Sequence, residues 1–236
     1  MKNSIFKFKH FQIDQSRSAM KIGTDGVLLG AWTPIYSNPK TILDVGAGTG
    51  LIALMLAQRL PESRITAVEI EKAAAEEAFD NFTNSSWSKR LCLIHDNIID
   101  FSENSKVFFD LIVSNPPFFK NSFKVSDATR STARDNFHMS YEDLFSCVNI
   151  LLSPSGSFAM VCPIKYREEL ITKAELNQLY LERELMIKGT KSSSFKRILM
   201  QFSRTKTILK TEELILEESR NHRTFEHQKL VNDFYL

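Results

Sequence analysis

Short apolar runs alternate with helical patterns along most of this chain. Five runs have the length and apolar character of buried strands. They are Thr41–Val45, Arg64–Glu69, Leu91–His95, Phe108–Ser114 and Ser157–Cys162. Helical patterns follow several of them, over Leu51–Leu60, Glu71–Phe82, Ser140–Leu152 and Lys165–Leu176. Apolar strands that alternate with helices predict an α/β fold, in which a mostly parallel, doubly wound sheet is covered on both faces.

Two further extended runs follow the last of these helices. Tyr180–Ile187 and Phe195–Phe202 are joined by the short polar segment 188–194, which predicts an antiparallel hairpin. Ser140 is expected to be the N-cap of the helix it precedes. Acidic residues of the 71–82 helix are expected to mark its solvated face. They are Glu71, Glu76, Glu77 and Asp80.

The two ends of the chain lie outside this alternation. Residues 1–35 form an N-terminal extension, in which Thr24 or Asp25 is expected to cap a helix that starts near Gly26. Residues 212–236 are expected to be a C-terminal tail whose apolar end, Leu230–Leu236, docks as a short helix and tail. Because no repeat and no Pro/Gly-rich linker divides the chain, we expect a single domain over residues 1–236.

Composition restricts the class of protein. The 236 residues have a net charge of +2, and no apolar run approaches the roughly 20 residues that span a bilayer. The N-terminus lacks the long apolar region of a secretory signal, so we expect a cytoplasmic protein without a membrane partner. Cys92, Cys147 and Cys162 lie far apart in apolar segments. We interpret them as reduced core residues, and their spacing predicts no metal site.

A glycine-rich loop joins the first strand to its helix. It reads Asp44-Val-Gly-Ala-Gly-Thr-Gly50, so Gly46, Gly48 and Gly50 alternate. Glycines let a backbone turn tightly and approach a ligand closely. The dinucleotide-binding motif has the different spacing G-x-G-x-x-G. Asp44 would also repel a pyrophosphate, which disfavours a dehydrogenase, whereas it suits the cationic amino group of an amino-acid moiety.

Acidic residues also follow the next two strands. Glu69 ends the second strand, where a carboxylate can accept hydrogen bonds from ribose hydroxyls. Asp96 and Asn97 follow the third strand and can contact an adenine amino group, although Asp96 could instead cap the loop.

Together, these features resemble the class I S-adenosylmethionine-dependent methyltransferases over roughly residues 20–205. The resemblance implies a Rossmann-like, seven-stranded sheet with an antiparallel last strand. It implies S-adenosylmethionine as the cofactor, S-adenosylhomocysteine as the product and no metal. It also adds Ile70, which follows Glu69, to the cofactor-binding residues.

The fourth strand ends in Asn115-Pro116-Pro117-Phe118. This motif resembles the signature of methyltransferases that modify a planar nitrogen. The side-chain carbonyl of Asn115 and the backbone carbonyl of Pro116 can accept the two N–H groups of an exocyclic amine. Proline rigidity would hold both acceptors in place, which is electrostatic preorganisation. Phe118 would stack on a target base that has been flipped out.

Longer segments resemble a narrower family. Met20–Trp32, which reads M-K-I-G-T-D-G-V-L-L-G-A-W, together with the glycine loop and the N-P-P-F-F stretch, resembles the bacterial tRNA1(Val) (adenine(37)-N6)-methyltransferases. The resemblance implies methylation of the exocyclic N6 amino group of an adenine beside the anticodon. It also places Thr24 and Asn115 near the cofactor.

The distribution of charge favours an RNA partner. Residues 188–210 contain seven Lys/Arg and no acid, and basic residues also follow the N-P-P-F-F stretch. Such clusters neutralise phosphates. The candidate RNA-binding residues are Lys120, Lys124, Arg130, Arg134, Lys196 and Arg197. We expect tRNA as the partner and no obligate protein partner.

Other functions stay open at this point. Two are methylation of a guanine in ribosomal RNA and methylation of a protein glutamine. The third is a non-catalytic RNA-binding module on the same fold, although the intact glycine loop and Asn115–Phe118 stretch argue against it.

Overall fold

The computed structural model describes residues 4–18, 20–35, 38–117 and 139–236. The strands are β1 (Ile5–Lys7), β2 (Gln12–Asp14), β3 (Thr41–Val45), β4 (Arg64–Glu69), β5 (Leu91–His95), β6 (Phe109–Ser114), β7 (Leu152–Pro163), β8 (Tyr180–Lys188), β9 (Arg197–Ser203), β10 (Lys210–Ile215), β11 (Glu217–Ser219) and β12 (His222–Arg223). The α-helices are α1 (Thr24–Trp32), α2 (Leu51–Arg59), α3 (Lys72–Thr83), α4 (Ile98–Asn104), α6 (Tyr141–Leu151), α7 (Arg167–Leu176) and α8 (Phe225–Val231). The predicted strands and helices are confirmed to within a few residues at most ends.

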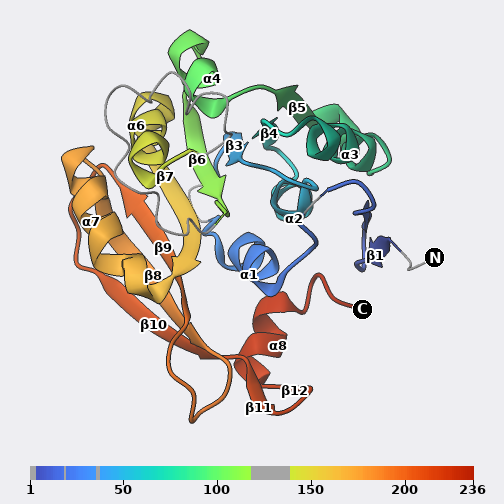
Figure 1. The fold of residues 1–236 in the computed structure, drawn as a ribbon, viewed down its shortest axis with the longest axis vertical. Helices are drawn as coiled ribbons and strands as arrows, with labels where there is room; N and C mark the ends of the chain where they lie inside the picture. The colour runs from blue at the N-terminus through green and yellow to red at the C-terminus, as the bar shows by residue number, and fades with distance from the viewer. Residues whose placement is uncertain (1–3, 19, 36–37, 118–138) are drawn as a thin grey trace, which may run out of the picture.

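The main sheet is mixed and mostly parallel, in the strand order β10-β8-β9-β7-β6-β3-β4-β5 (Figure 1). β9 is antiparallel to both β7 and β8, which confirms the predicted C-terminal hairpin. The sheet has an eighth strand beyond the expected seven. β10 pairs with β8 in parallel and buries Leu214, so the tail expected from Glu212 begins inside the sheet.

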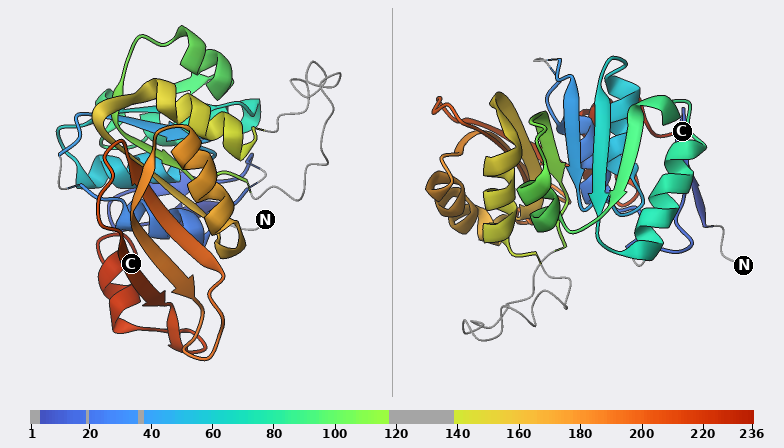
Figure 2. Two further views of the ribbon diagram at one scale, coloured as in Figure 1. Left: turned by 90° about the vertical axis from the view of Figure 1, so that its left-hand side faces the viewer. Right: turned by 90° about the horizontal axis from the view of Figure 1, so that it is seen from above.

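Helices pack on both faces of the sheet, as Figures 1 and 2 show. Successive residues of a strand point to opposite faces, so Ile42 joins one apolar core and Leu43 joins the other. The first core lies against α1, α2, α3 and α8, and the second lies against α4, α6 and α7. This double covering explains why the strands read as continuous apolar runs.

Local capping agrees with the sequence at one helix and differs at another. Ser140 caps α6 in a reciprocal capping box with Asp143, as expected. The cap predicted for α1 is wrong, because α1 begins at Thr24 and its N-cap is Gly23, which makes no side-chain capping bond. Asp25 has a different partner, Arg197, in the main sheet.

The N-terminal extension is fastened to α3 by a buried carboxylate. The expectation that Glu77 faces solvent is wrong, because Glu77 is fully buried. Its Oε1 accepts a hydrogen bond from the Arg17 amide at 2.6 Å, and its Oε2 accepts one from the Ser18 amide at 3.0 Å. The N-terminal extension supplies both donors, and it buries Glu77 by packing over it.

The chain ends pack together. Phe234 is buried, and the Lys9 amide donates a hydrogen bond to its carbonyl at 2.8 Å. The apolar C-terminal end therefore docks as predicted, against the N-terminal extension. Cys147 and Cys162 are buried free thiols, but Cys92 is exposed on the edge strand β5, which corrects its expected core position. Among the described residues, no helix has the length and apolar character to cross a membrane.

Candidate active site

The carboxyl ends of β3 and β6 meet where the strand order reverses (Figure 1). Val45 pairs with Ser114 in register, and the Ser114 hydroxyl donates a hydrogen bond to the Val45 carbonyl at 2.9 Å. The glycine loop and Asn115 therefore begin side by side. Such a reversal is the topological switch point at which open α/β sheets bind their ligands.

The three loop glycines have left-handed backbones, with φ of 70° at Gly46, 55° at Gly48 and 81° at Gly50. A Cβ on Gly46 or Gly48 would meet no heavy atom within 4 Å, so the backbone there is open to a ligand. A Cβ on Gly50 would stand 2.4 Å from the Phe82 ring of α3. The first two glycines thus leave room for a ligand, and the third permits close packing.

Asp44 lies beneath this loop and is 1% exposed. Its Oδ2 accepts a hydrogen bond from the Ala53 amide at 3.1 Å, while its Oδ1 is buried and has no hydrogen-bond partner among the described residues. Burial raises the pKa of Asp44 to about 7, and the charge of Glu69 acts in the same direction. A buried carboxylate with an unpaired oxygen is complementary to a cationic group. The amino group of S-adenosylmethionine fits this requirement.

Glu69 is buried at the end of β4, and backbone amides already bond its carboxylate. Oε2 accepts from the Gly48 amide and Oε1 from the Glu71 amide, each at 2.8 Å. The expected free carboxylate is therefore partly occupied. Each oxygen has a second lone pair, so Glu69 fixes the glycine loop and still has acceptor capacity for ribose hydroxyls.

The end of β5 lies beside the end of β4. The Asp96 amide donates to the Glu69 carbonyl at 3.1 Å, and the His95 ring lies 3.1 Å from the Ile70 carbonyl. The Asn97 side chain caps α4 through a hydrogen bond from the Ile99 amide. Asn97 has only that one side-chain oxygen, whereas Asp96 has a charged carboxylate with two oxygens, of which Oδ1 accepts from the Asn97 amide. Asp96 is therefore the better acceptor for an adenine amino group.

Asn115 lies against the first turn of α1. A Cβ built on Gly26 would stand 3.6 Å from Asn115 Nδ2 and 3.1 Å from Leu51 Cδ2. α1 therefore approaches both the catalytic candidate and the first residue after the glycine loop. The amide nitrogen of Asn115 is turned toward α1, so its carbonyl oxygen lies further from Gly26. Pro116 is buried and Pro117 is exposed, whereas Phe118 lies outside the described residues.

The sequence of the whole chain matches known proteins. Residues 16–183 match the family described as "Methyltransferase small domain". The chain is 45% identical to the tRNA1(Val) (adenine(37)-N6)-methyltransferase of Flavobacterium psychrophilum, over 98% of this chain and 99% of that protein. It is 38% identical to the protein of the same name from Pectobacterium carotovorum, over 98% of this chain and 93% of that one.

This chain belongs to the tRNA1(Val) (adenine(37)-N6)-methyltransferase family. Solved structures agree at the level of the fold. A predicted O-methyltransferase from Agrobacterium tumefaciens superposes with a TM-score of 0.66 at 18% identity, covering 89% of this chain and 96% of that one. A putative RNA methyltransferase from Pyrococcus horikoshii gives a TM-score of 0.53 at 17% identity, covering 75% and 82%.

Within this tRNA1(Val) methyltransferase family member, the candidate RNA-binding residues divide into two groups. Lys196 is exposed directly before β9, while the neighbouring Arg197, the first residue of β9, is half-buried and bonded to Asp25. The others lie outside the described residues: Lys120, Lys124, Arg130 and Arg134.

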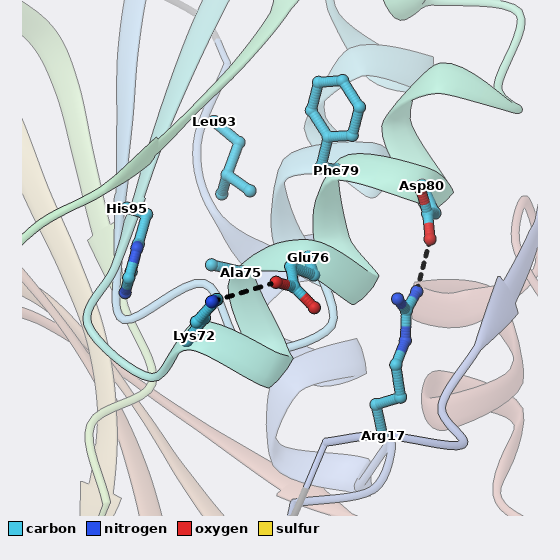
Figure 3. Close-up of a pocket in the computed structure, with 8 residues that line it drawn as sticks. All are labelled: Arg17, Lys72, Ala75, Glu76, Phe79, Asp80, Leu93 and His95. Carbon is cyan, nitrogen blue, oxygen red and sulfur yellow. Dashed lines mark hydrogen bonds and ion pairs between the residues drawn. The ribbon is translucent and has the colours of Figure 1, made fainter.

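A groove lies between α3, β5 and the N-terminal extension, and His95 at the carboxyl end of β5 is part of its lining (Figure 3). Its volume is about 390 Å³, and its charges are matched in pairs, Arg17 with Asp80 and Lys72 with Glu76. Among the described residues, no group of three His, Cys, Asp or Glu side chains is placed to hold a metal ion.

Sequence reasoning missed two residues of the site. Gly26 was expected only as a helix start, and Ser114 only as the end of a strand. Both lie within the motifs Thr24-Asp25-Gly26 and Ser114-Asn115-Pro116, so the signal was present. Their partners, Asn115 and Val45, are distant in sequence, and only the fold brings them together.

Proposed function

We propose that this protein transfers the methyl group of S-adenosylmethionine to the exocyclic N6 amino group of adenine 37, beside the anticodon of tRNA1(Val). The single observation that carries the proposal is the placement of Asn115 beside the glycine loop, at a strand pair fixed by Val45 and Ser114. Full-length similarity to proteins named for this reaction supports the choice of substrate.

The cofactor-binding role falls to residues that converge on the strand ends. Asp44 would pair with the amino group of the cofactor, and Glu69 would accept from its ribose hydroxyls. Asp96 would accept from its adenine amino group, with Ile70 and Asn97 beside it. Thr24, in the first turn of α1, would lie at its methionine end. When bound, the cofactor supplies a methyl group on a positively charged sulfur.

Asn115 and Pro116 would orient the target amine. An amino group conjugated to a purine is a poor nucleophile, because its lone pair is delocalised into the ring. The Asn115 side-chain carbonyl and the Pro116 backbone carbonyl would accept its two N–H groups and favour a pyramidal nitrogen. The acceptors are held before the substrate arrives, which is preorganisation. In-line positioning contributes further.

No strong base is required of these residues. The methyl carbon would exchange its bond to sulfur for a bond to the nitrogen, so sulfur would leave as a neutral thioether and the nitrogen would become positively charged. Its extra proton would then leave to water. Pro117 would keep the two acceptors rigid. Phe118 would stack on the flipped adenine, which compensates for part of the cost of unstacking it.

RNA would bind through basic side chains of this chain. Lys196 is exposed directly before β9, and Lys120, Lys124, Arg130 and Arg134 follow the N-P-P-F-F stretch in sequence. We expect the protein to act in the cytoplasm, as one methyltransferase domain over residues 1–236, without an obligate protein partner.

Methyl transfer from labelled S-adenosylmethionine to total tRNA, followed by nucleoside analysis, tests the proposal. Label in N6-methyladenosine is expected. A tRNA1(Val) transcript with adenine at position 37 should accept label, and a matched transcript with guanine there should not. Label in guanosine of ribosomal RNA or in protein glutamine would instead establish an alternative. RNA binding with no transfer to any of these substrates would indicate a non-catalytic module.

A further inference from the structure

Arg197 connects the sheet to the helix that lies against Asn115. Its Nε donates a hydrogen bond to Asp25 Oδ2 at 2.8 Å, and the two side chains are 35% and 24% exposed. Arg197 is the first residue of β9 and pairs in register with Pro163 of β7 and Ile187 of β8. Its backbone is thus held between two strands, which makes it a fixed point for α1.

The first turn of α1 has no local cap. Side chains cap four other helices, namely Glu71 on α3, Asn97 on α4, Ser140 on α6 and Thr224 on α8. The N-cap of α1 is Gly23, which makes no side-chain bond. The position of the first turn of α1 therefore depends on tertiary contacts.

The opposite end of α1 has its own arginine. Arg59 of α2 donates hydrogen bonds to the Gly30 and Thr33 carbonyls, at 2.8 and 2.7 Å. At the N-terminal end of α1, the ion pair between Asp25 and Arg197 holds the helix to the sheet in the same way. Asp25 directly precedes Gly26, the residue that α1 presents to Asn115.

We infer that Arg197 and Asp25 position Asn115 for catalysis by holding the first turn of α1 against it. Arg197 is then a positioning residue and not a contact to tRNA phosphate. The inference rests on the proposed function. Without the ion pair, the first turn of α1 can move away from Asn115. Small displacements of an orienting group reduce the rate of the chemical step, so the pair affects kcat more than the affinity for tRNA.

The two roles for Arg197 predict different behaviour for Asp25. If the pair positions Asn115, Asp25→Ala and Arg197→Ala should each lower kcat about tenfold. The double variant should fall no further than Arg197→Ala, because each substitution already removes the contact that the two side chains share. If Arg197 binds phosphate, Asp25→Ala should leave kcat unchanged and strengthen tRNA binding, since it removes a competing carboxylate. Arg197→Ala should then weaken binding and flatten its salt dependence.

The experiment is a double-mutant cycle on the full chain, with single-turnover rates and tRNA affinities measured at two salt concentrations. Lys196→Ala is the matched comparison, and it should weaken tRNA binding. Arg197→Lys should recover part of kcat, because it retains a cation that can reach Asp25. Additive losses of kcat, or a loss confined to tRNA affinity in Arg197→Ala, would overturn the inference.

Hydrogen exchange separates this inference from the proposed function. Amides of residues 24–29 should exchange faster in Asp25→Ala and Arg197→Ala than in the wild-type protein, with α6 amides unchanged as the internal control. If the wild-type protein methylates no tRNA, the proposed function fails while this measurement still tests the fastening of α1. Unchanged exchange in α1 would overturn the positioning role, whatever the substrate.

Discussion

Gly26 and Asn115 are 89 residues apart in the chain but close together in the fold, with the amide nitrogen of Asn115 only 3.6 Å from where a Cβ of residue 26 would stand. The same Cβ would stand 3.1 Å from Leu51 Cδ2, so this glycine lies between the residue proposed to orient the amine and the helix that follows the cofactor loop.

Gly26→Ala should therefore lower kcat about tenfold, because the added methyl group would stand only 3.1 Å from Leu51 Cδ2. Leu51 or the first turn of α1 must then shift by a few tenths of an ångström, which changes how α1 lies against Asn115. Gly23→Ala is the matched control, since a Cβ at residue 23 meets nothing within 4 Å and its φ of −120° suits alanine. Single-turnover methylation of tRNA measures both variants. An equal effect of the two substitutions would contradict the role assigned to Gly26.

Asn115→Ala should lower kcat by about two to three orders of magnitude, the usual cost of removing one preorganised hydrogen-bonding group. The lost carbonyl acts on the target amine, so the affinity for S-adenosylhomocysteine should change much less. Rates and calorimetric titrations on the same preparation separate the two effects. Activity near that of the wild-type protein would remove Asn115 from the mechanism.

Cofactor affinity should depend on pH near neutrality. The pKa of Asp44 is raised to about 7 in the cofactor-free protein, and only its ionised form attracts a cationic amino group. As pH falls below 7, Asp44 takes up a proton, and affinity should decrease about tenfold per pH unit. Titrations of S-adenosylhomocysteine at pH 5.5 and 7.5 measure the change. Asp44→Asn should bind weakly at both pH values, whereas a pH-independent wild-type affinity would contradict the assignment.

Ionisation of Asp44 should favour cofactor binding but lower the stability of the fold. In the unfolded chain Asp44 loses its proton near pH 3.8, but in the folded protein it retains the proton up to about pH 7. Folding stability therefore decreases as pH rises through this window. Without cofactor, Asp44→Asn should raise Tm relative to the wild-type protein at pH 8 more than at pH 4, which a pair of thermal melts can establish.

Glu77→Ala should destabilise the protein by about 1–3 kcal/mol, because it leaves the partly buried amide of Arg17 and the buried amide of Ser18 without their acceptor. Glu76→Ala, one residue away, removes an exposed ion pair with Lys72, whose Nζ lies 3.9 Å from Glu76 Oε1. It should lower the free energy of unfolding by less than about 0.5 kcal/mol. Urea unfolding compares them. Similar midpoints for the two variants would show that the extension is held by other contacts.

The sequence by itself was sufficient for the parallel core of the sheet, the C-terminal hairpin and the Asp44 and Asn115 motifs. These depend on local periodicity and on short motifs, which a linear chain displays directly. The roles of the individual site residues stay predictions, although the fold brings Asp44, Glu69 and Asn115 to neighbouring strand ends.

Only the tertiary structure decided which polar groups have partners. Glu77 reads as a surface acid until the N-terminal extension docks on it, and the sequence does not reveal the ion pair of Arg197 with Asp25, 172 residues earlier in the chain. β10 was not predicted either. It forms by pairing with β8, and β9 separates these two strands in the chain. A charged or polar side chain has no periodicity that specifies its partner. That partner is determined by long-range packing, which brings together segments that the sequence keeps apart.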